Sequence, residues 1–160
     1  MFGEDGVAGR NTGGACTEAA GEHPQMARLD AAEIRVGVCE CVAAALSLPV
    51  EKIRPEDKII MELGGDSLDL LDITFRLEQR FSISISPRDM ERRVKARLNG
   101  TPIEIDGLYT AEAMAEFRAS MPEIPAEEFA EGLTVAGFPR LFRVATLMNL
   151  VTRLSGEQHG

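Results

Sequence analysis

The hexapeptide Leu63-Gly64-Gly65-Asp66-Ser67-Leu68 separates a polar stretch from an apolar, periodic one, and it constrains the chain more than any other segment. Its two glycines let the backbone turn freely, and the apolar period that follows predicts a helix that begins at Asp66/Ser67. The first turn of a helix has unpaired N–H groups and a partial positive charge, which both favour an anionic group. We therefore interpret Ser67 as a point of attachment, suited to carry a phosphate, rather than as a catalytic residue.

The charge balance limits the kinds of partner that this 160-residue chain can have. Its formal net charge is -9, whereas a nucleic-acid binder has a basic footprint. An acidic surface fits protein partners with basic patches. No apolar run approaches the roughly 18 residues that span a bilayer, and the first residues lack the basic and apolar regions of a signal peptide. We expect a cytoplasmic monomer with no nucleic-acid partner and no membrane span.

The chain has three cysteines, which are consistent with the expected cytoplasmic location: Cys16, Cys39 and Cys41. Cys39 and Cys41 are two residues apart in a helical pattern and point to different faces, which disfavours both a disulfide and a shared metal ion. We expect buried free thiols. No metal site is expected elsewhere, because the carboxylates between Glu104 and Glu131 lack the ligand spacing of a calcium loop.

The first ordered element is expected to be a helix that begins near Asp30. Residues 1–28 contain six glycines and no sustained apolar period, which predicts a disordered tail; a wrongly assigned start of the chain is the alternative. Asp30 is a plausible N-cap with Glu33 three residues later. Apolar residues then recur at helical spacing up to Pro49. They are Ile34, Val38, Cys41, Val42, Ala45 and Leu46.

Residues 50–65 are expected to form a loop between the first two helices. Pro55 and the polar run Arg54–Lys58 break any regular pattern there. Four apolar residues would anchor the loop in a core: Ile53, Ile59, Ile60 and Leu63.

The helix expected from Asp66/Ser67 to about Phe81 has two apolar stripes. The inward stripe contains Leu70, Ile73, Leu77 and Phe81. The second stripe contains Leu68, Leu71 and Phe75, bordered by Asp69, Asp72, Arg76 and Gln79. It could widen the core face, or it could form a surface patch for partners, because an apolar centre with a charged rim is the composition of an interface. The pattern alone leaves both readings open.

The second half of the chain is organised by charge. Ser82–Ser86 alternates like an extended linker, residues 88–97 are rich in Arg and Lys, and residues 104–131 are rich in Asp and Glu. Between the basic and acidic stretches, Asn99-Gly100-Thr101-Pro102 is a strong breaker. Helices are expected at Ala111–Ala119 after the cap Thr110, at Ala126–Ala130 after Pro125, and, with an amphipathic pattern, at Val144–Leu154.

Taken together, these segments resemble an acyl carrier protein. The residues that carry the resemblance are Val50–Asp57, the motif Leu63–Asp69, the helix Ser67–Phe81, and Phe142–Leu147, which is similar to the start of the family's final helix. The similarity covers residues 30–86 and 139–154. It implies an all-α, acyl-carrier-like four-helix bundle with a long loop between helices one and two, and here with an additional, mostly helical insertion before the last helix.

The resemblance implies that the Ser67 hydroxyl, between Asp66 and Leu68, is esterified by 4′-phosphopantetheine, whose thiol carries acyl groups as thioesters. Such a protein is not an enzyme. A phosphopantetheinyl transferase would supply the arm from coenzyme A, with a magnesium ion that does not stay bound to the carrier.

The resemblance also favours the docking reading of the second stripe. It implies that Leu68, Leu71 and Phe75 face partner enzymes of acyl-chain synthesis or acyl transfer. The carboxylates that would attract the basic patches of these enzymes are Asp69, Asp72 and Glu78. Arg76 and Arg80 depart from the uniformly acidic helix of housekeeping carriers, which indicates a dedicated set of partners.

The insertion at 87–138 is the largest departure from an ordinary carrier. With it, residues 29–154 would form one acyl-carrier-like domain, followed by a flexible C-terminus at 155–160. The insertion could be a self-neutralising elaboration packed on the bundle, or a lid that lengthens an acyl cavity, as in enlarged carriers that serve unusual, including very-long-chain, lipids. The lid residues would be Leu108, Met114, Phe117, Met121, Ile124, Phe129 and Leu133.

The leading function is therefore a free-standing carrier of fatty-acid or specialised lipid synthesis. A peptidyl or polyketide carrier, in which Gly64-Gly65 is tolerated, and an unmodified interaction module with the same fold are the alternatives. Catalysis is not expected, because His23 and His159 lie too near the chain ends to activate Ser67. The side chain of Asp66 should diverge from Ser67, and no oxyanion-binding partner is indicated.

Overall fold

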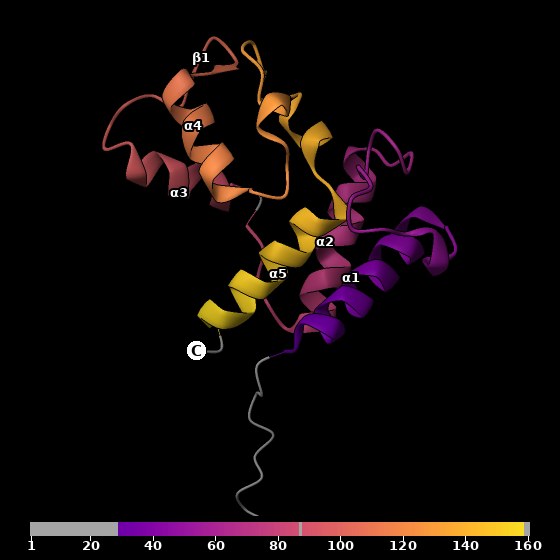
Figure 1. The fold of residues 1–160 in the computed structure, drawn as a ribbon. Helices are drawn as coiled ribbons and strands as arrows, with labels where there is room; N and C mark the ends of the chain where they lie inside the picture. Colours follow the sequence, from indigo (N-terminus) through magenta and orange to yellow (C-terminus); the bar gives the residue numbers. More distant parts are fainter. Residues whose placement is uncertain (1–28, 87, 159–160) are drawn as a thin grey trace, which may run out of the picture.

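The computed structural model describes residues 29–86 and 88–158, and its regular structure is mostly helical (Figure 1). The helices are α1 (Ala31–Leu46), α2 (Ser67–Phe81), α3 (Asp89–Arg97), α4 (Ala111–Ser120) and α5 (Val144–Gln158). A two-stranded antiparallel sheet pairs β1 (Glu104–Ile105) with β2 (Leu108–Tyr109), and short 3₁₀ turns lie at Val50–Lys52, Ala126–Glu128 and Phe138–Leu141. The all-α prediction is confirmed. The expected tail at 1–28, Cys16 and both histidines lie outside the described residues.

Helices α1, α2 and α5 surround the first of two apolar cores. The Asp30–Glu33 capping box that the sequence predicts starts α1, and α2 begins and ends where expected. Ile53 and Ile59 anchor the intervening loop by full burial, whereas Ile60 and Leu63 are only partly buried. The buried side chains of this core include Ile34, Val38, Val42, Ile73, Leu77, Phe81, Val144, Leu147 and Val151.

The insertion builds a second core of its own. An aromatic cluster lies at its centre, with the Tyr109 ring 4.9 Å from Phe117 and 5.2 Å from Phe138 between centroids. Phe142 packs against both cores and joins them. The other buried members of the second core are Val94, Ala113, Met114, Met121, Ile124, Phe129 and Leu141.

This second core corrects the interpretation of the insertion as a lid. Of the seven expected lid residues, five are buried against one another, Leu133 is partly buried and Leu108 is exposed. They fill a core instead of lining an acyl cavity. The insertion does contact the bundle, as the other interpretation expects, since Asp89 pairs with Arg153 of α5 at 3.4 Å. Its apolar side chains, however, gather around their own centre. Figure 1 shows this body on one side of α5, with α1 and α2 on the other.

Three local features of the second half differ from the sequence expectation. The basic stretch forms helix α3, and Asp106 and Gly107, both with positive φ, form the two-residue turn of a β-hairpin. The helix expected at Ala126–Ala130 is only a 3₁₀ turn, because the backbone leaves helical geometry at Phe129, whose side chain is buried in the second core.

The last helix is longer than expected. It continues to Gln158, so residues 155–158 are helical rather than a flexible end. The Gln158 side chain donates to the Ser84 carbonyl at 3.0 Å and accepts from the Ser84 amide at 2.9 Å. These bonds fix the segment after α2 against the end of α5. Within the described residues, no helix is long and apolar enough to cross a bilayer.

Candidate functional site

Ser67 is the first residue of α2 and is exposed. Asp66 caps the helix, since its Oδ1 accepts from the amides of Leu68 at 2.8 Å and Asp69 at 2.9 Å. In turn, Oδ2 of Asp69 accepts a hydrogen bond from the Asp66 amide at 3.0 Å. The two carboxylates thus form a capping box that fixes the first turn. Because the Asp66 carboxylate is bound to backbone N–H groups, it serves the helix and is not a base for Ser67.

The two glycines before Asp66 have different roles. Gly64 has a φ of +79°, a conformation that L side chains rarely adopt, and a Cβ there would meet no atom within 4 Å. Gly65 is buried, and a Cβ on it would lie 3.1 Å from both the Ile59 carbonyl oxygen and the Leu46 Cδ2 atom. Gly65 therefore lets the chain pass close to the loop and α1, while the space beside Gly64 is open.

The loop that leads to Ser67 is tied by its backbone to the start of α5. Lys58 and Arg143 form an isolated antiparallel bridge. The amide-to-carbonyl bonds on either side of this pair are Ile59 to Phe142 (3.1 Å) and Val144 to Asp57 (3.0 Å), and a further one joins Ala145 to Pro55 (2.8 Å). Within the loop, the Gly65 amide donates to the Ile59 carbonyl at 2.9 Å. The start of α2 is thus held by a short chain of backbone bonds that begins at α5.

The second apolar stripe of α2 lies on the surface. Leu68, Leu71 and Phe75 are 74%, 59% and 59% exposed, so they do not widen the core face. We call these three residues the α2 patch. Of the carboxylates beside it, Asp72 pairs with Arg76 at 3.1 Å, and Asp69 belongs to the capping box.

The remaining charged residues that the sequence singles out on α2 are engaged within the chain. The Glu78 carboxylate accepts from the Ile85 amide at 2.6 Å and so holds the segment after the helix. Arg80 pairs with Glu40 of α1 at 2.8 Å. Arg76 and Arg80 are therefore each bound to a carboxylate of this chain, which weakens their interpretation as contacts for a dedicated partner set.

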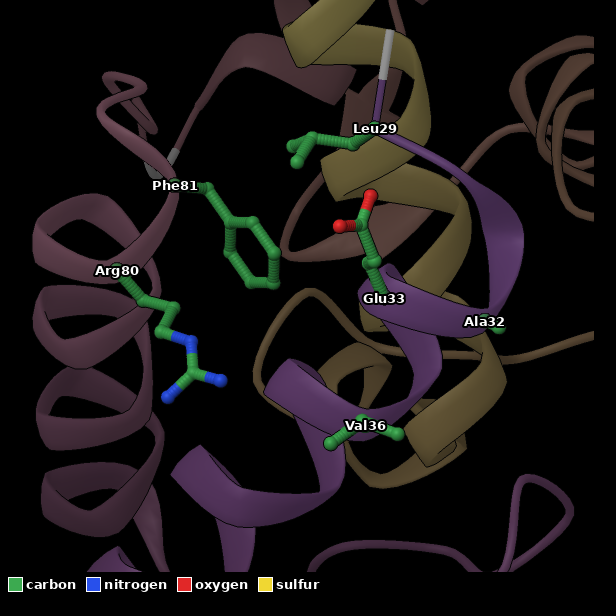
Figure 2. A pocket seen from close by; sticks show the side chains of 6 residues that line it. All are labelled: Leu29, Ala32, Glu33, Val36, Arg80 and Phe81. Carbon is green, nitrogen blue, oxygen red and sulfur yellow. The ribbon is translucent and has the colours of Figure 1, made fainter. Parts of the chain in front are cut away.

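An open pocket of about 410 Å³ lies at the far end of α2 (Figure 2). Ser67 and Phe81 are at opposite ends of this helix, which places the pocket about 20 Å from the serine at a rise of 1.5 Å per residue. The pocket is therefore separate from the serine site. It is lined by Leu29, Ala32, Glu33, Val36, Arg80 and Phe81.

The described residues include no group of three or more His, Cys, Asp and Glu side chains that could hold a metal ion. Cys39 and Cys41 are free and buried, as expected, and burial raises the pKa of both thiols. An exposed hydroxyl without a neighbouring base can receive a group from an external enzyme but cannot itself drive a displacement.

This geometry fits a phosphodiester-linked arm. The Ser67 hydroxyl is exposed at the positive end of a helix, and open space lies beside Gly64. Ser67 would hold the group covalently, and Asp66 would hold Ser67 through the helix cap. The sequence pattern singles out Ser67 and Asp66, but it does not indicate the contact of Lys58 with Arg143, since no local spacing signals their pairing.

Comparison with known proteins points to the part of the chain that contains Ser67. A family model described as a phosphopantetheine attachment site matches residues 36–94 and so ends within α3. An acyl carrier protein of Campylobacter jejuni subsp. doylei is 39% identical over 54 residues, which are 34% of this chain and 70% of the relative. That of Syntrophobacter fumaroxidans is 33% identical over 63 residues, 39% of this chain and 78% of the relative. No solved structure matches.

Proposed function

Because this chain belongs to the acyl carrier protein family, whose members are carriers and not catalysts, we propose that it holds its prosthetic group, 4′-phosphopantetheine, on the hydroxyl of Ser67. When bound, the arm supplies a thiol that holds an acyl group as a thioester. The observation that carries the proposal is an exposed serine at the first turn of a capped helix with no base beside it. The base for the attachment reaction must then come from the modifying enzyme.

The α2 patch is the proposed docking surface for partner enzymes. Its three apolar side chains begin one residue after Ser67 and follow the exposed face of the same helix. An apolar centre beside Asp69 and Asp72 fits a partner surface with an apolar pocket and a basic rim. Glu78 stands at the end of this face and mainly holds Ile85.

The proposed pathway is fatty-acid or specialised lipid synthesis in the cytoplasm. The relatives named acyl carrier protein support a carrier of acyl chains. Peptidyl or polyketide carriage uses the same attachment chemistry, and the nature of the acyl group found on the purified protein separates these pathways. An unmodified interaction module would keep the α2 patch but would leave Ser67 free.

Intact mass measured after incubation with coenzyme A, magnesium and a broad-specificity phosphopantetheinyl transferase tests the attachment. We expect one added phosphopantetheine on the wild type and none on Ser67→Ala. Ser86→Ala, which removes another exposed hydroxyl, is the matched control and should be modified like the wild type. Absence of the added mass on the wild type, or equal addition to Ser67→Ala, would overturn the proposal.

A further inference from the structure

Glu128 of the insertion binds two cations of the carrier bundle. Its Oε1 lies 2.6 Å from Nη2 of Arg143, and its Oε2 lies 3.1 Å from Nζ of Lys58. A longer contact of 3.5 Å joins Nη1 of Arg143 to Oε2. Both carboxylate oxygens are thus used, and Arg143 is only 9% exposed. The insertion and the bundle therefore meet at a partly buried, charge-assisted cluster.

The two cations of the cluster keep the Glu128 carboxyl group ionised. Burial alone would raise the pKa of Glu128, but hydrogen bonds from Arg143 and Lys58 outweigh it and hold the pKa below its ordinary value. The carboxylate is consequently ionised at neutral pH. Without it, Lys58 and Arg143 would be two like charges facing each other across a single β-bridge, where directly opposed like charges are destabilising.

Lys58 is also the residue around which the turn before Ser67 is organised. Its carbonyl accepts from the amides of Glu62 (2.9 Å) and Leu63 (3.0 Å), and its own amide donates to the Glu62 carboxylate (2.7 Å). The next residue, Ile59, accepts from Gly65, which directly precedes the Asp66 cap. A displacement of Lys58 from Arg143 would therefore be passed through two backbone contacts to the first turn of α2.

We propose that Glu128 is a positioning residue for Ser67, which it serves by pinning the turn at 58–65 to the start of α5 through Lys58 and Arg143. This inference rests on the proposed role of Ser67 as the attachment residue. It gives the insertion a specific task in the carrier, namely to present the serine in one orientation to the modifying enzyme. The polar contacts of Glu128 are with Lys58 and Arg143 and not with Ser67, so its effect is exerted through Lys58.

The test compares Glu128→Gln with Glu127→Gln in the full chain, using phosphopantetheine transfer from coenzyme A as the readout. Glu127 is the adjacent carboxylate, is exposed, and has no ion pair within the described residues. We expect Glu128→Gln to lower kcat of the transfer by roughly tenfold, because misplacement of a reacting group lowers the rate of the chemical step. KM should change little, because the α2 patch is intact, and Glu127→Gln should behave like the wild type.

A second variant separates positioning from folding. Lys58→Gln removes the contact on the loop side and leaves the buried Arg143–Glu128 pair in place, so the insertion stays docked. It should show the same loss of kcat, and the Gly65 amide should exchange with solvent faster in both variants. The amides of α4, in the second core, should exchange as in the wild type. A merely structural role would change stability without changing kcat at temperatures where all the variants are folded.

The outcomes distinguish this inference from the proposed function. If wild-type protein is modified on Ser67 and Lys58→Gln keeps the wild-type kcat and Gly65 exchange, the positioning role is wrong and the carrier function stands. If the wild type is not modified, or is modified elsewhere, the proposed function fails and this inference fails with it. A reduced kcat in both variants, together with wild-type behaviour of Glu127→Gln, supports the inference even if Glu128→Gln is also less stable.

Discussion

The Phe81 ring of α2 lies directly against Gly37 of α1, where a Cβ would stand 2.5 Å from the ring Cζ atom. The absence of a side chain at 37 thus allows the two helices to cross closely. We expect Gly37→Ala to lower the free energy of unfolding by about 1–2 kcal/mol, because the overpacking cost exceeds the better helix propensity of alanine. Urea unfolding followed by circular dichroism measures the change.

The same substitution in α5 supplies the control. Gly156 is a helical residue at which a Cβ would meet no atom within 4 Å. Gly156→Ala should therefore raise the free energy of unfolding by about 0.5–1 kcal/mol through helix propensity alone. Stabilisation by both substitutions would show that the Phe81 ring moves aside freely, against the close contact described above.

A second prediction concerns the α2 patch. Leu71→Ser should raise KM for the phosphopantetheinyl transferase by about tenfold, because truncation of a central apolar contact costs about 1–2 kcal/mol of binding. Thermal stability should be unchanged, since Leu71 is exposed. Val36→Ser is a matched control, because Val36 is 53% exposed on α1 and lies outside the patch. Equal KM values for the two variants would contradict docking at the patch.

The elements that sequence predicts well here are those with their signals close together in the chain. Asp30 and Thr110 each cap a helix at the predicted place, and each cap is a contact across two or three residues. The α3 helix was missed because its sequence has four basic side chains and only one fully buried residue, Val94, which leaves no clear apolar period. The hairpin turn at Asp106-Gly107 was also missed, although the dipeptide Asp-Gly is a recognised signal for a two-residue hairpin turn.

The residues of the candidate site also differ in how far the local sequence predicts them. The position of Ser67 at the first turn of a helix follows from a local motif, and the structure places it there. The exposure of Leu68, Leu71 and Phe75 could not be decided from α2 alone, because it depends on which elements cover the second stripe. The pairing of Lys58 with Glu128 joins residues far apart in the chain, and charge composition carries no information on such a pair.

Tyr109 gives a third prediction, since it is the only tyrosine of the chain. Burial in the second core, and then the hydrogen bond from its hydroxyl to Glu91 at 2.8 Å, raise the pKa of Tyr109 far above the ordinary value of 10.0. A raised folded-state pKa contributes stability that is fully present below pH 10 and is lost as the pH rises above it. We expect the ultraviolet absorbance of the folded protein to show no tyrosinate until alkaline unfolding, whereas urea-unfolded protein titrates near pH 10. A native titration near pH 10 would contradict the burial of Tyr109.

The ion pairs along α5 give a fourth prediction, on acid stability. Besides Glu128, Asp89 of α3 pairs with Arg93 at 2.8 Å and with Arg153 of α5 at 3.4 Å. Burial would raise the pKa of Asp89, but hydrogen bonds from Arg93 and Arg92 outweigh it and lower the pKa. For both carboxyl groups, depression of the folded-state pKa gives stability that is present above their ordinary values of 4.5 and 3.8.

This stability is lost as the pH falls through the folded-state pKa values, because protonation removes the anion shared by Lys58 and Arg143 and the one shared by Arg93 and Arg153. We therefore expect the thermal midpoint of the wild type to fall steeply on acidification below pH 4.5, the ordinary value for Glu128. Glu128→Gln should start from a lower midpoint at neutral pH and lose less on acidification, since it has already lost one of the two charges. Parallel pH profiles for Glu128→Gln and Glu127→Gln would show that Glu128 contributes no linked stability.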